Sequence, residues 1–272
     1  MQLFEKLIDH PEAVRLVLEN THRLAAEDVP LVEARGLALA QDLKARFDSP
    51  PFDNSAVDGY ALRSADAEAG RVFRVVDEAP AGRPAAKSVG EGEAIKIFTG
   101  GVIPEGADAV VMVENTSGWG EEFELKKAAS PGQNVRGSGE DVREGEVILR
   151  AGTEVGPPEI ALAATQGYGA LPVHRRPEVV VLSTGTELVE PGERELEPGE
   201  IHDSNSFAVM AQAHEIGARA RRITAASDDD AVLRRAVEEA LETADVVVTS
   251  GGVSVGEKDL VKGTMLNLGV EQ

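Results

Sequence analysis

The chain has 272 residues, a length typical of about two domains, and its 48 acidic and 27 basic residues give a formal net charge of −21. This charge excludes a general nucleic-acid-binding protein, which needs a basic face, and disfavours docking on anionic membranes. A hydrophobic content of 42% supports buried cores, and the absence of cysteine excludes disulfides and thiolate chemistry. No apolar run could span a membrane, and residues 1–6 lack the features of a signal peptide, so we expect a soluble, cytoplasmic protein.

The first part of the chain, residues 11–47, carries helical patterns. Pro11 stands where a first helical turn tolerates proline, and an apolar face follows over residues 13–18. Val32–Phe47 repeats alanine and leucine at three- and four-residue spacing, which predicts a second helix. Pro50 and Pro51 then end the helical region.

Residues 52–150 have the texture of a small β domain. Glycine and proline separate short apolar runs, which predict strands at Val72–Val76, Ala94–Phe98, Ala109–Val113 and Phe123–Leu125. The turn-rich stretch 141–158 precedes a further helical pattern over residues 158–165. If this helix pairs with the N-terminal ones, the β region is an insertion between them.

From Pro177 onward, strand and helix patterns alternate. Predicted strands lie at 179–182, 220–223 and 245–249, and predicted helices at 204–216, 229–243 and 257–268. This order predicts an open, mostly parallel α/β sheet. Three strands are few for such a sheet, so we expect the sequence to stop inside a domain.

Two glycine-rich loops follow the first and last of these strands. In open α/β sheets ligands bind at the carboxyl ends of the strands, and glycines there let the backbone approach a phosphate. The candidate ligand-binding residues are Thr184, Gly185, Ser250, Gly251, Gly252, Ser254 and Gly256. Neither loop is a Walker A motif or a Gly-x-Gly-x-x-Gly motif, and the alternative interpretation is that both are ordinary tight turns.

Three acidic residues accompany the loops, namely Glu187, Asp228 and Asp259. These carboxylates would repel an anionic ligand unless a Mg²⁺ ion bridged the two. All three are therefore candidate metal ligands. The alternatives are helix capping for Asp228, a solvated side chain for Glu187, and a favourable helix dipole for Asp259. The five histidines show no metal-binding spacing and are expected to have surface or core roles.

Several motifs resemble signatures of the molybdopterin molybdenumtransferase family, which includes bacterial MoeA and the E domain of gephyrin. They cover the chain from about residue 10 to its end, in the family's order: 51–61 (PFDNSAVDGYA), 99–108, 139–141 (GED), 183–188 (STGTEL) and 249–256 (TSGGVSVG). Ala56-Val57 departs conservatively from the family's usual Ala-Met. Glu257-Lys258 departs at a variable position, and Asp259 is retained.

The resemblance implies the last step of molybdenum cofactor synthesis, in which molybdate is inserted into adenylylated molybdopterin and AMP is released with the aid of Mg²⁺. It also implies a multidomain α+β and α/β fold. The expected domains are a helical linker domain (1–48 with 141–176), an inserted β domain (49–140) and a molybdopterin-binding α/β domain (177–272), which we expect to be incomplete. The family's Lys-Pro-Gly-Lys-Pro loop and C-terminal β barrel have no counterpart here, so we expect residues 1–272 alone to lack insertion activity.

The family's active cleft lies between the α/β domain of one subunit and the β domain of the other. Carried over by motif, Asp58 and Thr99 therefore belong to one wall of the cleft, and Glu187, Asp228 and Asp259 to the opposite wall. Composition gave no chemistry to Asp58 or Thr99. The implied partners are a second copy of the chain and molybdopterin adenylyltransferase-type proteins.

Two other functions stay open at this point. The first is a non-catalytic molybdopterin-binding or scaffold protein of the gephyrin type, which would bind receptor loops without turnover. The second is a molybdopterin adenylyltransferase, which needs only the part from residue 177 onward. The motifs around Asp58 and Thr99 argue against the second.

Overall fold

The computed structural model describes residues 8–225, 230–251 and 260–270. The chain forms two compact units. The first comprises residues 1–41, 152–160 and 169–272, and the second comprises residues 42–151 and 161–168. Helix α2 (Pro157–Thr165) begins in the first unit and ends in the second.

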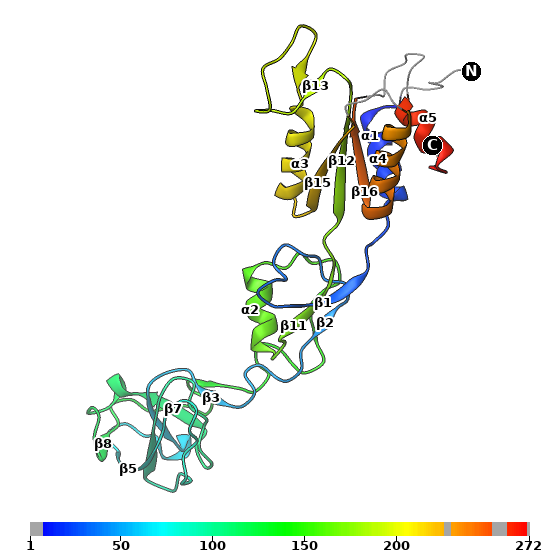
Figure 1. Ribbon diagram of the computed structural model, residues 1–272. Helices are drawn as coiled ribbons and strands as arrows, with labels where there is room; N and C mark the ends of the chain where they lie inside the picture. Colours follow the sequence, from blue (N-terminus) through cyan, green and yellow to red (C-terminus); the bar gives the residue numbers. More distant parts are fainter. Residues whose placement is uncertain (1–7, 226–229, 252–259, 271–272) are drawn as a thin grey trace. The chain divides into compact units, whose positions relative to one another are not determined.

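The second unit is built mainly from strands (Figure 1). A five-stranded sheet has the order β7-β4-β6-β5-β8. Its strands are β4 (Gly59–Leu62), β5 (Val72–Ala79), β6 (Glu93–Ile97), β7 (Ala109–Met112) and β8 (Glu122–Glu124). Strands therefore form at all four apolar runs that the sequence predicts. The shorter elements are β2 (Leu43–Lys44), β3 (Asn54–Ser55), η1 (Ser64–Asp66), η2 (Val113–Asn115), β9 (Val135–Arg136) and β10 (Val147–Leu149).

Both faces of this sheet are covered, which explains why its strands are nearly continuous apolar runs. Alternate residues of a strand point to opposite faces, so Tyr60 and Leu62 enter one cluster with Phe73 and Phe123. Ala61, between them, enters a second cluster with Ile95 and Ile97 on the other face. Each face thus has its own core.

The first unit contains an open parallel sheet with the order β15-β12-β16. Strand β12 (Glu178–Thr184) pairs with β15 (Arg219–Ala225) from Glu178↔Arg219 to Thr184↔Ala225. It pairs with β16 (Val246–Ser250) from Val179↔Val246 to Ser183↔Ser250. These parallel pairs agree with the order of strands and helices predicted from residue 177 onward.

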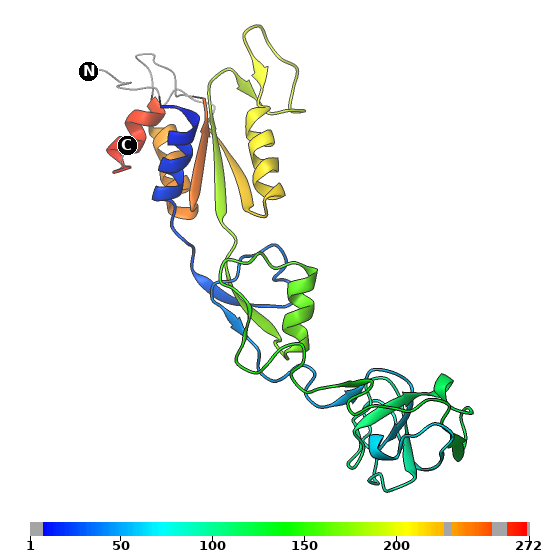
Figure 2. The ribbon, with the colours of Figure 1, turned by 180° about the vertical axis from the view of Figure 1, so that it is seen from behind.

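Helices cover both faces of this sheet (Figures 1 and 2). Helix α3 (Asn205–Glu215) packs on one face, where Val179 and Val181 meet Ala213. Helices α4 (Asp230–Thr243) and α5 (Leu260–Asn267) cover the other face, where Leu182 meets Val237 and Val261. A strand buried on both sides is continuously apolar, as Val179–Leu182 is.

The remaining elements of this unit are helix α1 (His10–Asn20) and the strands β1 (Ala26–Pro30), β11 (Ala170–His174), β13 (Leu188–Val189) and β14 (Ile201–His202). Strands β1 and β11 form an antiparallel pair, and β13 and β14 a parallel one. Helix α1 carries the predicted proline in its first turn, and Asp9 caps it by accepting a hydrogen bond from the Glu12 amide. No helix within the described ranges is long and apolar enough to cross a membrane.

The second helix predicted over Val32–Phe47 is wrong. Gly36 has φ +74°, and the chain beyond it is extended, with the Leu39 amide donating to the Thr153 carbonyl and the Ala45 amide to the Glu146 carbonyl. Leu37 and Leu39 are buried, as are Leu43 and Ala45, which is the two-residue period of a strand. The leucines and alanines of this segment fit both a helical and a strand spacing. The backbone pairing with distant segments selects the strand. The expected linker domain is therefore less helical than predicted.

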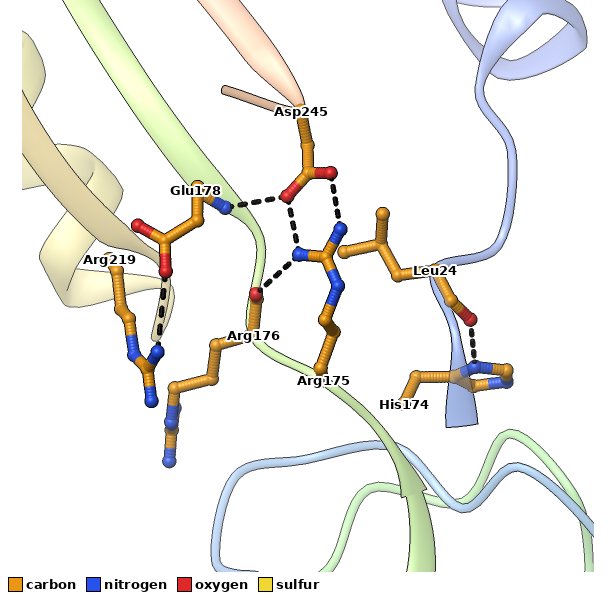
Figure 3. Close-up of polar contacts among 7 residues, drawn as sticks. All are labelled: Leu24, His174, Arg175, Arg176, Glu178, Arg219 and Asp245. Atoms are coloured by element: carbon orange, nitrogen blue, oxygen red, sulfur yellow. Dashed lines mark hydrogen bonds and ion pairs between the residues drawn. The ribbon is translucent and has the colours of Figure 1, made fainter. Parts of the chain in front are cut away.

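Polar contacts fix the amino ends of the parallel strands (Figure 3). Asp245, just before β16, accepts two hydrogen bonds of 2.6 Å from Arg175 and one of 2.8 Å from the Glu178 amide. The Arg175 guanidinium and the Glu178 amide hold the pKa of Asp245 below its usual value. Arg219 forms an ion pair with Glu178 at 3.3 Å. These contacts align the three strands, and the opposite ends carry the glycine loops.

Candidate functional site

The first residues of the two glycine loops lie at the carboxyl ends of neighbouring strands. Ser183 and Ser250 are register partners, so the loops after them start at the same edge of the sheet. A cavity of about 110 Å³ lies at this edge. It is lined by Ser183, Thr184, Glu187, Leu188, Ile201, His202, Asp203, Ser204, Asn205, Ser250 and Gly251, and we call it the strand-end pocket.

Gly251 is required by the close approach of the two strand ends. Its φ is +90°, and a Cβ at this position would lie 2.4 Å from the Thr184 carbonyl oxygen. Thr184 itself is nine-tenths buried, and its hydroxyl has no hydrogen-bond partner within the part of the chain that the structure describes. The pocket therefore offers a buried hydroxyl with unused hydrogen-bonding capacity.

Glu187 presents its carboxylate over the first glycine loop. Gly185 has φ +147°, and a Cβ there would lie 2.5 Å from a carboxylate oxygen of Glu187. Glu187 is exposed, and among the described residues no side chain or amide pairs with its carboxylate. A carboxylate with no partner among the described residues can bind a cation, and the metal-ligand role of Glu187 stays a prediction.

The pocket lining offers carboxylate and hydroxyl oxygens, beside the imidazole of His202 and the amide of Asn205. Carboxylate and hydroxyl oxygens suit Mg²⁺, so Glu187 and Thr184 fit that ion chemically. Within the described ranges no group of three or more histidine, cysteine, aspartate or glutamate side chains is arranged for a metal. The other two predicted ligands, Asp228 and Asp259, lie outside the described residues, as do Gly252, Ser254 and Gly256.

A buried ion-pair network forms one side of the pocket, and sequence reasoning missed it. Asp203 is 2% exposed and accepts hydrogen bonds from the Ser206 hydroxyl at 2.5 Å and from Arg222 at 3.1 Å. Burial raises the pKa of Asp203, but the Ser206 and Arg222 hydrogen bonds outweigh it and hold the pKa below its usual value. Asp203 is therefore an ionised, fixed part of the pocket wall. The one available signal was the Asp-x-x-Ser spacing before α3, which is typical of a capping residue.

Asp58 and Thr99, in the second unit, are brought together by the sheet. They lie just beyond Gly59 and Ile97, which are register partners of β4 and β6. One carboxylate oxygen of Asp58 accepts hydrogen bonds of 2.8 Å from both the amide and the hydroxyl of Thr99. These two bonds lower the pKa of Asp58, so its carboxylate is ionised at neutral pH. The residue is also exposed.

The glycine that follows Asp58 has a steric cause. A Cβ at Gly59 would lie 1.8 Å from the Val111 carbonyl oxygen, so only glycine lets β4 pair with β7 here. The Val113 amide also donates to the Asp58 carbonyl. Two of the motifs quoted above thus meet at one point of the sheet, with Asp58 joining them.

Comparisons with known proteins match two successive stretches of the chain to family models. Residues 8–167 match the family described as "MoeA N-terminal region (domain I and II)", and residues 180–272 match "Probable molybdopterin binding domain". Because the first match spans more than half of the chain, the chain belongs to the MoeA family.

Curated relatives carry the name molybdopterin molybdenumtransferase. The Bacillus subtilis (strain 168) protein is 41% identical over 269 residues, which is 96% of this chain and 62% of the relative. Molybdopterin molybdenumtransferase 2 of Mycobacterium tuberculosis is 39% identical over 92% of this chain and 63% of its own length. The chain thus spans somewhat less than two thirds of the length of these relatives.

Solved structures support the same fold. Two crystal structures of the molybdopterin biosynthesis MoeA protein from Pyrococcus horikoshii match with TM-scores of 0.83 and 0.82, at 33% and 36% identity. They cover 97% and 90% of this chain and 67% of the solved chains. The mixed α/β architecture is therefore that of MoeA proteins.

Proposed function

We propose that this protein inserts molybdate into adenylylated molybdopterin and releases AMP, the last step of molybdenum cofactor synthesis. The observation that carries the proposal is the strand-end pocket. It combines Gly185 and Gly251 at two strand ends with the Glu187 carboxylate and the Thr184 hydroxyl, neither of which has a partner among the residues that the structure describes, in a chain of the MoeA family. Its relatives are named for this activity.

In this proposal the strand-end pocket binds the phosphate-bearing part of the substrate. Gly185 and Gly251 let the backbone come close to phosphate oxygens, and the Thr184 hydroxyl donates a hydrogen bond to one of them. The ion pair with Arg222 partly offsets the charge of Asp203 toward the anion, and both of its carboxylate oxygens already accept hydrogen bonds. The pocket thereby orients the phosphoanhydride for cleavage.

Glu187, together with Asp228 and Asp259, would hold Mg²⁺ at this site. The ion would neutralise phosphate charge and draw electrons from the phosphoanhydride, which lowers the barrier to AMP release. Glu187 supports this role because its carboxylate is exposed and engages no group within the described part of the chain. Without a cation, the carboxylates would repel the substrate.

Asp58 and Thr99 would supply the opposite wall of the cleft, contributed by a second copy of the chain in a homodimer. Both hydrogen bonds use one carboxylate oxygen of Asp58, and the other has no partner among the described residues, so it can contact a ligand. The division into 1–48 with 141–176, 49–140 and 177–272, the cytoplasmic location and the adenylyltransferase-type partners remain predictions of the same kind.

The test is molybdate-dependent release of AMP from adenylylated molybdopterin by the purified full-length protein, followed by chromatography; residues 1–272 alone are expected to release none. We expect AMP to appear only when molybdate and Mg²⁺ are both present. Binding of the substrate with no AMP release would favour the non-catalytic alternative. Consumption of ATP and molybdopterin would instead indicate an adenylyltransferase, which the match of residues 8–167 disfavours.

A further inference from the structure

Arg222 is buried behind the strand-end pocket and has more polar contacts than a single ion pair requires. It stands on β15, and its side chain is 13% exposed. Its guanidinium donates to both carboxylate oxygens of Glu190 at 3.0 and 2.9 Å and to Asp203 at 3.1 Å. It also donates to the Ser206 hydroxyl at 2.6 Å and lies 3.6 Å above the Phe207 ring.

Both carboxylates that Arg222 binds belong to one excursion of the chain, residues 185–204. Within this excursion, β13 and β14 pair through two residues each, Leu188↔Ile201 and Val189↔His202. Glu190 follows β13 directly, and Asp203 follows β14 directly. Arg222 therefore ties together the ends of both strands and anchors them to the main sheet.

The excursion also supplies more than half of the pocket lining, with Glu187 and Leu188 near its start and residues 201–204 at its end. A pair of strands only two residues long cannot hold its own geometry in water. The contacts to Arg222 are thus the polar anchor that keeps the two sides of the pocket at a fixed separation. Removing one partner of a buried pair also leaves the other charge without compensation.

We propose that Arg222 is a positioning residue for the strand-end pocket: by holding Glu190 and Asp203, it keeps the excursion in the geometry that binds the adenylyl phosphate of the substrate. This inference rests on the proposed function for the identity of the ligand. Arg222 does not line the pocket, so it acts on the ligand only through the residues that it holds.

The neighbouring Arg221 provides a matched control. It stands on the same strand but binds the other face, donating to Glu239 at 2.9 Å and to Thr243 at 2.6 Å, both on α4. Arg221→Met removes two hydrogen bonds of a strand arginine without touching the excursion. A general need for arginine on β15 would therefore weaken binding in both variants.

The experiment measures AMP binding to the purified protein by calorimetry, beside hydrogen exchange of residues 186–206. We expect Arg222→Met to weaken AMP binding by about tenfold or more, the usual scale for losing a residue that supports a ligand-contacting group. Arg222→Lys keeps the positive charge but loses the planar guanidinium that binds both Glu190 oxygens, so its AMP affinity should lie between those of the parent and Arg222→Met. Glu190→Gln, which keeps the contacts of Asp203, should weaken binding by less than Arg222→Met. Exchange should rise in 186–206 for the Arg222 variants, and Arg221→Met should bind AMP within about twofold of the parent.

Three outcomes separate the inference from the proposed function. The first outcome is that the parent binds AMP and that Arg222→Met, shown to be folded by circular dichroism, binds it within twofold of the parent. This result would overturn the positioning role alone. An equal loss in Arg221→Met and Arg222→Met would also overturn it. A parent protein that binds neither AMP nor adenylylated molybdopterin would contradict the proposed function, and the positioning role with it.

Discussion

At the residue scale, Gly251 combines a backbone angle and a neighbour that other residues do not tolerate. Its φ of +90° lies in the left-handed region, and the Thr184 carbonyl occupies the space of a side chain. Gly263, in the middle of α5, differs on both counts, because nothing lies within 4 Å of a Cβ there and its φ is not positive. The two glycines therefore predict opposite responses to the same substitution.

Gly251→Ala should lower the free energy of unfolding by at least about 1–3 kcal/mol, the usual cost of backbone strain, because the new methyl group also meets the Thr184 carbonyl. Gly263→Ala should leave stability unchanged or raise it by up to about 1 kcal/mol, since alanine favours a helix. Denaturant unfolding monitored by circular dichroism measures both. Equal stabilities of the two variants would show that Gly251 is not under strain.

The pKa of Asp58 is a second quantity at this scale. Its value in the folded protein is lowered by two hydrogen bonds from Thr99. The ionised contact therefore stabilises the fold above the unfolded value of about 3.9 and is lost as the pH falls through the lower folded value. Carboxyl NMR titration should show a midpoint below about 3.9.

Thr99→Val should raise this midpoint only part of the way, because the amide of residue 99 still donates to Asp58. Thr99→Ser keeps both donors and should titrate like the parent. If the valine variant also titrated like the parent, the hydroxyl would have no part in holding the carboxylate.

Residues of the candidate site differ in how far the sequence could predict them. Glu187 was predictable because it stands beside a glycine loop at a strand end. Asp203 and Arg222 were not, because they lie on different elements and their pairing depends on the excursion between β12 and α3. Asp58 and Thr99 were assigned by resemblance alone, and their hydrogen bond arises from the register of β4 with β6.

At the element scale, two buried hydroxyls hold the loop around Trp119, and the Thr116 hydroxyl accepts from the Gly118 amide at 3.1 Å. The Tyr60 hydroxyl donates to the Gly118 carbonyl at 3.1 Å and accepts from the Gly120 amide at 3.0 Å. Trp119 stays 47% exposed, and its ring centroid lies 5.2 Å from that of Tyr60. Because this is the only tryptophan of the chain, its fluorescence reports on the loop directly.

Tyr60→Phe should loosen the loop, shift the Trp119 emission and cost about 1–2 kcal/mol of stability, because the Gly118 carbonyl and the Gly120 amide lose the Tyr60 hydroxyl. Tyr168→Phe is the matched control, since its hydroxyl donates only to the Lys44 carbonyl. That variant should leave the emission unchanged. Identical emission spectra for Tyr60→Phe and the parent would show that the loop is held by other contacts.

The segment 32–47 shows where element prediction fails. Its alanines and leucines satisfy a helical spacing, yet its burial follows a strand spacing, because its backbone pairs with residues more than 100 positions away. The strands from residue 177 onward were predicted well, since a run buried on both faces has few alternatives. The local sequence pattern therefore predicts an element only where that pattern also indicates which segments pack against it.

At the scale of the whole molecule, a net charge of −21 acts against association with an anionic substrate. Salt screens this repulsion, since the Debye length falls to about 10 Å at 0.1 M. The KM for adenylylated molybdopterin should therefore decrease as salt rises from about 10 to 100 mM, with kcat nearly constant. An increase in KM over this range would indicate that local cations, rather than the global charge, govern association.

The account depends most directly on the carboxylate of Glu187 at the strand-end pocket. The decisive measurement is the rate of molybdate-dependent AMP release by Glu187→Gln, beside the parent and Glu193→Gln, an exposed glutamate outside the pocket lining. We expect Glu187→Gln, and likewise Asp228→Asn and Asp259→Asn, to be slower by about a hundredfold or more with normal folding. Glu193→Gln should match the parent. A Glu187→Gln variant that releases AMP at the parental rate would contradict the assignment of the reaction to this pocket.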